Sequence, residues 1–305
     1  ITDKKVLFAH APTGLGKTVS SLAPAIAHAL EQKKKIFFIT PKISQHEIVL
    51  ETVKLMNEKF GLNVKAVDLV GRRSMCIDPM LSSINYSSGF YEACMKKKKN
   101  KQCKFFTNAK GYTPKQKNAA RKRKIHLLKE FNKSHEEIKE ICFLQEMCPY
   151  EITLELTRKA DVIIGDYFHL FNDEIREGII AQAGFGLGDV IAIIDEAHNL
   201  SNRLIDMLAC SIDIRELEKA EKEAKNTASF DAEFAIKDIS KEVESLGTKL
   251  SLQRSSAVIP DEELDMLKKI GRDSLEKISI AASKFMKKYD TQGSFLLKVE
   301  YFINR

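Results

Sequence analysis

The chain has 305 residues, of which 44% are hydrophobic and 30% are charged, and its formal net charge at pH 7 is +7. This length suits one large domain or two ordinary ones, and the positive charge favours a polyanionic partner. No stretch approaches the ~20 apolar residues of a membrane-spanning helix, and the first residues lack a secretory pattern, so we expect no membrane association. Because the chain begins without methionine and leads straight into an apolar run, we expect it to be a fragment.

The first part of the chain alternates between strand and helix patterns. Apolar runs predict strands at residues 4–11, 36–40, 64–71, 161–167 and 189–197. Helical periodicity appears at residues 19–35, 44–60 and 149–160. Strands alternating with helices are typical of parallel sheets, so the pattern predicts an α/β fold.

Two segments depart from this alternation. Residues 72–148 hold five of the six cysteines, several lysine runs and few long apolar stretches, so we interpret them as an insertion in the sheet domain. Residues 206–305 contain charged amphipathic helices without a strand signal, which predicts a separate helical domain.

The stretch APTGLGKT, residues 11–18, has the spacing of a Walker A phosphate loop. A predicted strand precedes it and a helix follows it, which is the context that this motif requires. Glycines let backbone N–H groups turn toward phosphate oxygens, the lysine reaches the β- and γ-phosphates, and the threonine hydroxyl binds Mg²⁺. The predicted ATP-binding residues are Thr13, Gly14, Gly16, Lys17 and Thr18.

The run VIAIIDEAHNL, residues 190–200, places acidic residues at the end of an apolar strand. Ligands of open α/β sheets bind beyond the carboxyl ends of the strands. We therefore expect Asp195 to hold Mg²⁺ with Thr18, and Glu196 to orient and deprotonate the attacking water. We expect His198 to couple this site to nucleic acid or to a second lobe.

Four cysteines, Cys76, Cys94, Cys103 and Cys148, are separated by 17, 8 and 44 residues. No pair has the close spacing of a structural zinc knuckle, so spacing alone leaves an undetermined four-cysteine metal site. Cys142 lies on the apolar side of a predicted helix, where a free cysteine behaves as a small hydrophobe. Cys210 is expected to be an ordinary buried thiol.

The sequences around these cysteines, set between the phosphate loop and the DEAH box, resemble the XPD family of iron–sulfur superfamily 2 DNA helicases. They read RRSMCIDPM, EACMKK, KQCKFF and EMCPYEITLELTRKADVIIGDYFHLF. The resemblance runs over nearly the whole chain and is weak beyond residue 205. It implies a [4Fe–4S] cluster held by Cys76, Cys94, Cys103 and Cys148, which suits the preference of iron for thiolates. Cys142 does not match the family.

The resemblance also implies a domain plan and an activity. A RecA-like first motor domain would comprise residues 1–71 and 149–205, interrupted by an iron–sulfur insertion at residues 72–148 and followed by an incomplete helical Arch-like domain at residues 206–305. The whole protein would be an ATP-dependent DNA helicase that moves 5′→3′ and serves repair. A second motor domain is missing, so we expect little hydrolysis from this chain alone. It would be cytoplasmic in a microbe and nuclear in a eukaryote.

Nucleic-acid contacts are expected at three positions. No acidic residue occurs from Ala93 to Lys129, so this lysine-rich stretch favours phosphate contact. Arg72 and Arg73 resemble the basic position of the family, and Tyr167, after a strand end, could stack on bases. The expected partner is single-stranded DNA or a DNA fork.

Two alternatives remain open. One is a DinG-like or RNA-directed helicase, which the Walker A and DEAH motifs do not separate from the XPD type. The other is a zinc-stapled nucleic-acid-binding module with vestigial motor motifs. Iron content and absorbance of the purified protein would distinguish a thiolate-bound iron cluster from zinc.

Overall fold

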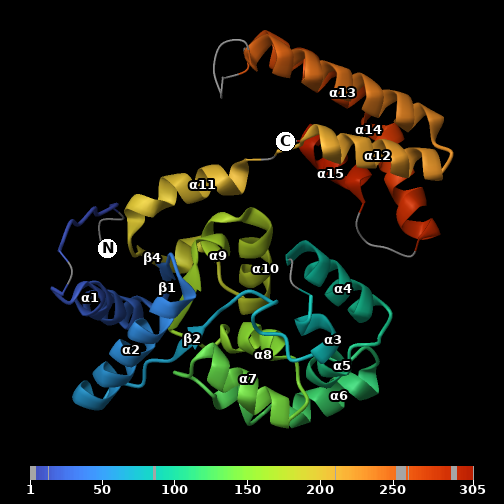
Figure 1. Cartoon of the computed structure of the whole chain (residues 1–305). Helices are drawn as coiled ribbons and strands as arrows, with labels where there is room; N and C mark the ends of the chain where they lie inside the picture. The colour runs from blue at the N-terminus through green and yellow to red at the C-terminus, as the bar shows by residue number, and fades with distance from the viewer. Residues whose placement is uncertain are drawn as a thin grey trace. The chain divides into compact units, whose positions relative to one another are not determined.

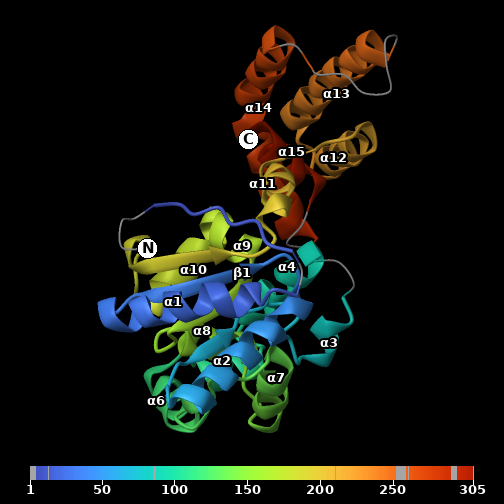
Figure 2. The ribbon, with the colours of Figure 1, turned by 90° about the vertical axis from the view of Figure 1, so that its left-hand side faces the viewer.

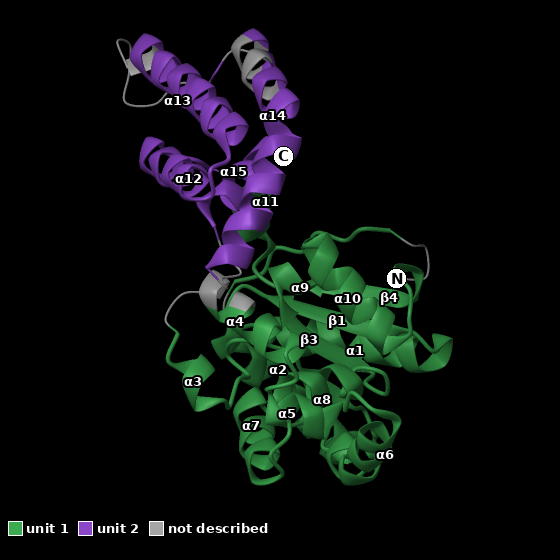
Figure 3. Ribbon diagram, turned by 90° about the vertical axis from the view of Figure 1, so that its right-hand side faces the viewer, with its two compact units in different colours: residues 1–208 green, residues 209–305 purple. Residues whose placement is uncertain are grey.

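The computed structural model describes residues 5–12, 14–84, 87–209, 211–251, 259, 261–289 and 294–304. It divides the chain into two compact units, residues 1–208 and 209–305 (Figure 3). Each unit has a hydrophobic core of its own. Thr13 and Cys210 lie outside the described residues.

The first unit is built on a four-stranded sheet in which every pairing is parallel. The strand order is β2-β3-β1-β4, with β1 at Lys35–Thr40, β2 at Ala66–Asp68, β3 at Val162–Asp166 and β4 at Val190–Ile194. Phe37 in β1 pairs with Ile163 on one side and with Ala192 on the other. The carboxyl ends of all four strands therefore meet at one edge of the sheet.

Successive residues of β1 point to opposite faces of the sheet. Ile36 and Phe38 share a core with α1 (Lys17–Gln32) and α2 (His46–Phe60). Phe37 and Ile39 share the other core with α7, α8 and α10 (Figures 1 and 2). Those helices span His135–Leu144, Pro149–Leu156 and Asp173–Ala183. Helices on both faces explain why β1 and β3 are almost uniformly apolar.

The segment between β2 and α8 folds as short helices. They are α3 (Pro79–Ser82), α4 (Ser87–Lys99), α5 (Lys104–Ala109), α6 (Pro114–Arg123) and α7. Ile138 and Cys142 of α7 belong to the core of the sheet. The last part of the predicted insertion is thus packed into the sheet unit.

The remaining helices of the first unit connect the strands. They are α9 (Tyr167–Phe171), α11 (Leu200–Leu208) and the 3-10 helices η1 (Ile43–Gln45), η2 (Leu127–Lys129), η3 (Leu187–Asp189) and η4 (Ala197–Asn199).

The secondary structure described for the second unit is helical. The unit consists of α12 (Ile214–Asn226), α13 (Phe230–Ser251), α14 (Asp261–Lys288) and α15 (Phe295–Asn304). Leu217, Ile236, Ile278 and Leu296 bring one residue from each helix into a common core. None of the helices in the described ranges combines the length and apolar character of a membrane span.

The strand predicted at residues 4–11 is wrong for the part that the structure describes. Residues 5–12 form neither strand nor helix, and Val6, Leu7 and Phe8 are 81%, 88% and 87% exposed. A strand needs a neighbour for its N–H and C=O groups. Among the described residues the sheet ends at β4, and residues 5–12 do not pair with it. The apolar residues therefore favour a strand, but no strand among the described residues pairs with them.

Candidate ATP site and cysteine pocket

The phosphate loop leads directly into α1. Gly14 and Gly16 have φ angles of 87° and 72°, in the left-handed region that side chains disfavour. Lys17 is the first residue of α1, so the free N–H groups of the first helical turn lie next to the loop. A glycine-rich turn at a helix N-terminus is a phosphate-binding arrangement.

Lys17 meets the DEAH box directly. Its Nζ donates a hydrogen bond to Oε1 of Glu196 at 3.0 Å. This bond and the positive charge of Lys17 lower the pKa of Glu196. The other oxygen of Glu196, Oε2, lies 3.4 Å from Nδ1 of His198, whose side chain is 72% exposed. The structure thus brings together three of the four predicted catalytic side chains.

Asp195, the fourth, follows the last residue of β4. Its N–H donates to the carbonyl oxygen of Ile39 at 2.8 Å, and its Oδ1 accepts from the N–H of Glu196 at 3.0 Å. The other carboxylate oxygen has no partner among the described residues. Carboxylate and hydroxyl oxygens are the ligands that Mg²⁺ prefers, so Asp195 and the half-buried Thr18 remain suitable donors.

The structure contradicts the prediction that Tyr167 stacks on bases. The ring is 2% exposed, and the hydroxyl lies 2.9 Å from the carbonyl oxygens of both Asp195 and Glu196. His169 is also buried and bonds to Asp166 at the start of α9. Phe168 is 43% exposed. A strand-end aromatic run did not reveal which ring faces solvent.

The four predicted cysteine ligands line one pocket. Cys76, Cys94, Cys103 and Cys148 surround about 370 Å³ of empty space, a volume that includes the open mouth. Cys142 is 1% exposed in the core of the sheet and does not line this pocket. Burial alone raises the pKa of Cys142 to about 12. The set that lines the pocket is therefore the set that the XPD resemblance implied.

The surroundings of these sulfur atoms suit thiolates bound to iron. Cys103 and Cys148 are the N-caps of α5 and α8, and helix N-termini stabilise negative charge. The Sγ of Cys103 accepts a hydrogen bond from a backbone N–H at 3.4 Å. Burial raises the pKa of Cys76 to about 11 and that of Cys148 to about 12. Burial also raises the pKa of Cys94, although the charges of Arg72 and Lys98 oppose this shift. Among the described residues, no three His, Cys, Asp or Glu side chains form a site for a single ion.

Arg72 points inward, which removes it as a candidate for DNA contact in this conformation. Its Nη1 donates to Oε1 of Glu151 at 3.0 Å, and its guanidinium lies 4.1 Å from the centre of the Tyr150 ring. It also lines the cysteine pocket. Arg73, in contrast, is exposed. Spacing from Cys76 placed both arginines near the pocket but could not distinguish their directions.

Sequence reasoning missed a pair of carboxylates on α8. Glu151 is 3% exposed and accepts from Lys98 as well as Arg72. Burial acts to raise the pKa of Glu151, but Lys98 and Arg72 hold it below its ordinary value. One turn later, Glu155 accepts from Nζ of Lys124 at 2.5 Å. Two glutamates four residues apart among apolar residues were the available signal.

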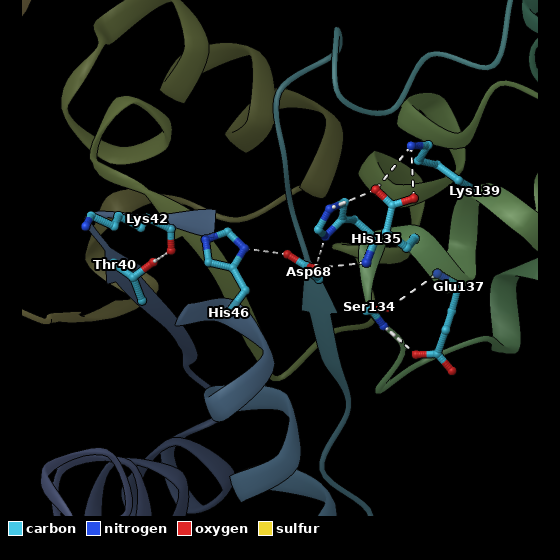
Figure 4. A network of polar contacts seen from close by, with 9 residues as sticks. Thr40, Lys42, His46, Asp68, Ser134, His135, Glu137 and Lys139 are labelled. Carbon is cyan, nitrogen blue, oxygen red and sulfur yellow. Dashed lines mark hydrogen bonds and ion pairs between the residues drawn. The ribbon is translucent and has the colours of Figure 1, made fainter. Parts of the chain in front are cut away.

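A second missed network centres on Asp68 at the end of β2 (Figure 4). Its Oδ1 lies 2.5 Å from Nδ1 of His46 on α2, and its Oδ2 lies 2.8 Å from Nδ1 of His135 on α7. The N–H of His135 also donates to Oδ2 at 2.8 Å. Despite its burial, these bonds lower the pKa of Asp68 to about 2. One carboxylate therefore joins the sheet to helices from both sides.

A phosphate loop that faces an acidic strand end on a parallel sheet defines a P-loop nucleotide-binding protein. The family model DEAD_2 matches residues 40–218, more than half of the chain, and the chain belongs to this family. This membership confirms the resemblance to XPD-type helicases that the motifs indicated.

Relatives and a solved structure agree. The chain is 27% identical over 277 residues to ATP-dependent DNA helicase XPD of Sulfolobus acidocaldarius, covering 90% of this chain and 41% of that protein. It is 24% identical over 246 residues to the XPD helicase subunit of general transcription and DNA repair factor IIH of Dictyostelium discoideum, covering 75% and 29%.

A solved XPD helicase has a TM-score of 0.51 and 21% identity, covering 92% of this chain and 47% of that one, which confirms the α/β fold. The chain spans less than half the length of each of these proteins.

Proposed function

We propose that this chain is the nucleotide-binding and iron–sulfur part of an ATP-dependent DNA helicase of the XPD type, moving 5′→3′ in DNA repair. The contact of Lys17 with Glu196 at 3.0 Å carries the proposal, because it joins the phosphate-binding cation to the predicted base. The relatives named as ATP-dependent DNA helicases support it.

The site residues would act as follows. When ATP binds, Lys17 would leave the Glu196 carboxylate and contact the β- and γ-phosphates. The freed carboxylate would then orient and deprotonate the attacking water. Mg²⁺, held by Thr18 and Asp195, would neutralise charge on the phosphates. Before ATP binds, the hydrogen bond from Lys17 lowers the pKa of Glu196 and keeps the carboxylate deprotonated.

The cysteine pocket supports a [4Fe–4S] cluster held by Cys76, Cys94, Cys103 and Cys148. When bound, the cluster would supply covalent cross-links between α4, α5, α8 and the loop after β2. Arg72 and Lys98 would offset its negative charge. Zinc in place of iron, with a colourless protein, would favour the zinc-stapled alternative.

We place the DNA-binding surface on exposed cations and one exposed ring. Arg73 and the exposed lysines among residues 93–129 would contact phosphates, and Phe168, rather than Tyr167, would contact bases. The preferred substrate is single-stranded DNA or a fork.

The decisive experiment compares ATP hydrolysis by the complete enzyme and its Lys17→Ala variant, with and without single-stranded DNA. DNA-stimulated hydrolysis that disappears in the variant, with unchanged thermal unfolding, is the expected result. Hydrolysis equal to that of the parent would contradict the proposed function. An RNA strand that stimulates better than DNA would favour the RNA-directed alternative.

A further inference from the structure

The backbone of Glu196 has an unusual conformation. Its φ and ψ angles are 48° and 44°, in the left-handed region. A non-glycine residue is strained in this sparsely populated region and persists there only when its surroundings hold it. Something must therefore stabilise the turn that aims the Glu196 carboxylate at Lys17.

Tyr167 is placed to do this. Its hydroxyl lies 2.9 Å from the carbonyl oxygens of Asp195 and Glu196, the two residues that form the turn. A phenol has a single proton, so the two carbonyls share one donor. The ring is 2% exposed and packs in the core of the sheet, which fixes the position of the hydroxyl.

The strand order explains why a long side chain is needed. Tyr167 follows β3 and Glu196 follows β4, and these strands lie on opposite sides of β1. Neighbouring strands are about 4.8 Å apart, so the two strand ends are separated by about 10 Å. A tyrosine can cross the end of β1 and still donate a hydrogen bond on the far side.

We propose that Tyr167 is a positioning residue for ATP hydrolysis, which holds the DEAH turn in its strained conformation so that Glu196 faces the phosphate site. This inference rests on the proposed function, since it assigns Tyr167 a part in the same reaction. The Tyr167 hydroxyl contacts the backbone carbonyl oxygens of Asp195 and Glu196. It acts only through Glu196.

The test is the Tyr167→Phe variant of the complete enzyme, which removes one oxygen atom and keeps the ring. We expect kcat for ATP hydrolysis to fall by about tenfold or more, because a misplacement of ~1 Å can cost about a hundredfold in rate. The KM for ATP, the affinity for a non-hydrolysable ATP analogue and the thermal unfolding midpoint should remain near those of the parent.

Tyr112→Phe is the matched control. The hydroxyl of Tyr112 also donates to a backbone carbonyl, that of Lys98, at 2.7 Å, but outside the ATP site. Its loss should leave kcat unchanged. A fall in kcat that is equal in both variants would contradict the specific role of Tyr167.

A double-mutant cycle asks whether Tyr167 acts through Glu196. In the Glu196→Gln background, adding Tyr167→Phe should leave the residual rate unchanged, because effects of residues that act as a unit are not additive. If Tyr167→Phe lowers the rate of ATP hydrolysis by the same factor in the parent and in Glu196→Gln, the inference is overturned. A kcat for Tyr167→Phe within twofold of the parent would also overturn it. If the inference fails in this way, the proposed function still holds as long as the parent hydrolyses ATP and Lys17→Ala does not.

Discussion

Individual side chains at the ATP site are arranged by backbone geometry. Glycines in left-handed conformations shape the phosphate loop, and Glu196 adopts the same conformation without being glycine. As a result, Lys17 and Glu196, which lie 179 residues apart in sequence, form a direct ion pair. At this scale the carboxylate of Glu196 is the group on which hydrolysis depends.

Glu196→Gln should therefore bind nucleotide but turn it over slowly. The amide keeps the size and hydrogen-bonding capacity of the side chain but cannot accept the proton of the attacking water. We expect kcat to fall by much more than tenfold, or ~1.4 kcal/mol of activation free energy, with near-normal affinity for an ATP analogue. Hydrolysis within about tenfold of the parent would place the base elsewhere.

Among the elements, α8 connects the predicted insertion, residues 72–148, to the sheet. Its buried Glu151 accepts hydrogen bonds from Arg72 and Lys98, both of which lie in the predicted insertion. A helix that carries one buried and one half-buried carboxylate, Glu151 and Glu155, thus attracts a lysine-rich segment that would otherwise repel itself. This electrostatic attachment does not require a metal cluster.

Glu151→Gln should destabilise the protein markedly. Removing the charge leaves Arg72 and Lys98 half-buried without a counter-ion, and breaking a buried pair costs about 3 kcal/mol. Urea denaturation of the variant and the parent measures the difference. Glu146→Gln, which breaks the exposed ion pair with Lys104, is the control and should change the free energy of unfolding little. Equal effects of the two substitutions would contradict the role of α8.

The attachment of α7 to β2 should depend on pH. Hydrogen bonding to Asp68 raises the pKa of His135 above 6.5 in the folded protein, and the pKa of Asp68 is lowered to about 2. The contribution of His135 is fully present below pH 6.5 and is lost as the pH rises through its folded pKa. The contribution of Asp68 is lost only as the pH falls below about 4 toward 2.

We therefore expect the stability difference between the parent and His135→Gln to be largest near pH 5 to 6 and to shrink by about 1 kcal/mol toward pH 9. Urea denaturation at several pH values measures it. Lys104→Gln, which removes the exposed ion pair with Glu146, serves as the control. A difference that grows with pH would show that His135 is neutral when it binds Asp68.

Across the whole molecule, the predicted insertion, residues 72–148, is held to the sheet unit in three ways. Its cysteines line one pocket, the α8 carboxylates bind its cationic side chains, and α7 enters the core of the sheet. Loss of one attachment should leave the other two. The segment is therefore better described as partly integrated into the sheet unit than as a free insertion.

Cys148→Ser should lose iron and strand separation in the complete enzyme, and Cys142→Ser should lose neither. Cys148 lines the pocket, whereas Cys142 is a buried core thiol. Limited proteolysis of Cys148→Ser should open the chain between Cys76 and Cys103 and spare α7. Loss of iron from Cys142→Ser but not from Cys148→Ser would overturn the ligand set, and retention by both would overturn the cluster.

The sequence by itself determined the parallel α/β plan, the phosphate loop and the DEAH strand end, and its resemblance to the XPD family implied the four cysteines of the pocket. The first three features are local, because each depends on residue types at short spacings or on the polarity of one run. Only the tertiary structure decided that the Val6–Phe8 run has no partner strand, that Arg72 turns inward and that Tyr167 is buried against the DEAH turn. The direction of a side chain and the pairing of a strand depend on neighbours that are distant in sequence. The sequence pattern does not show which distant residues will be in contact.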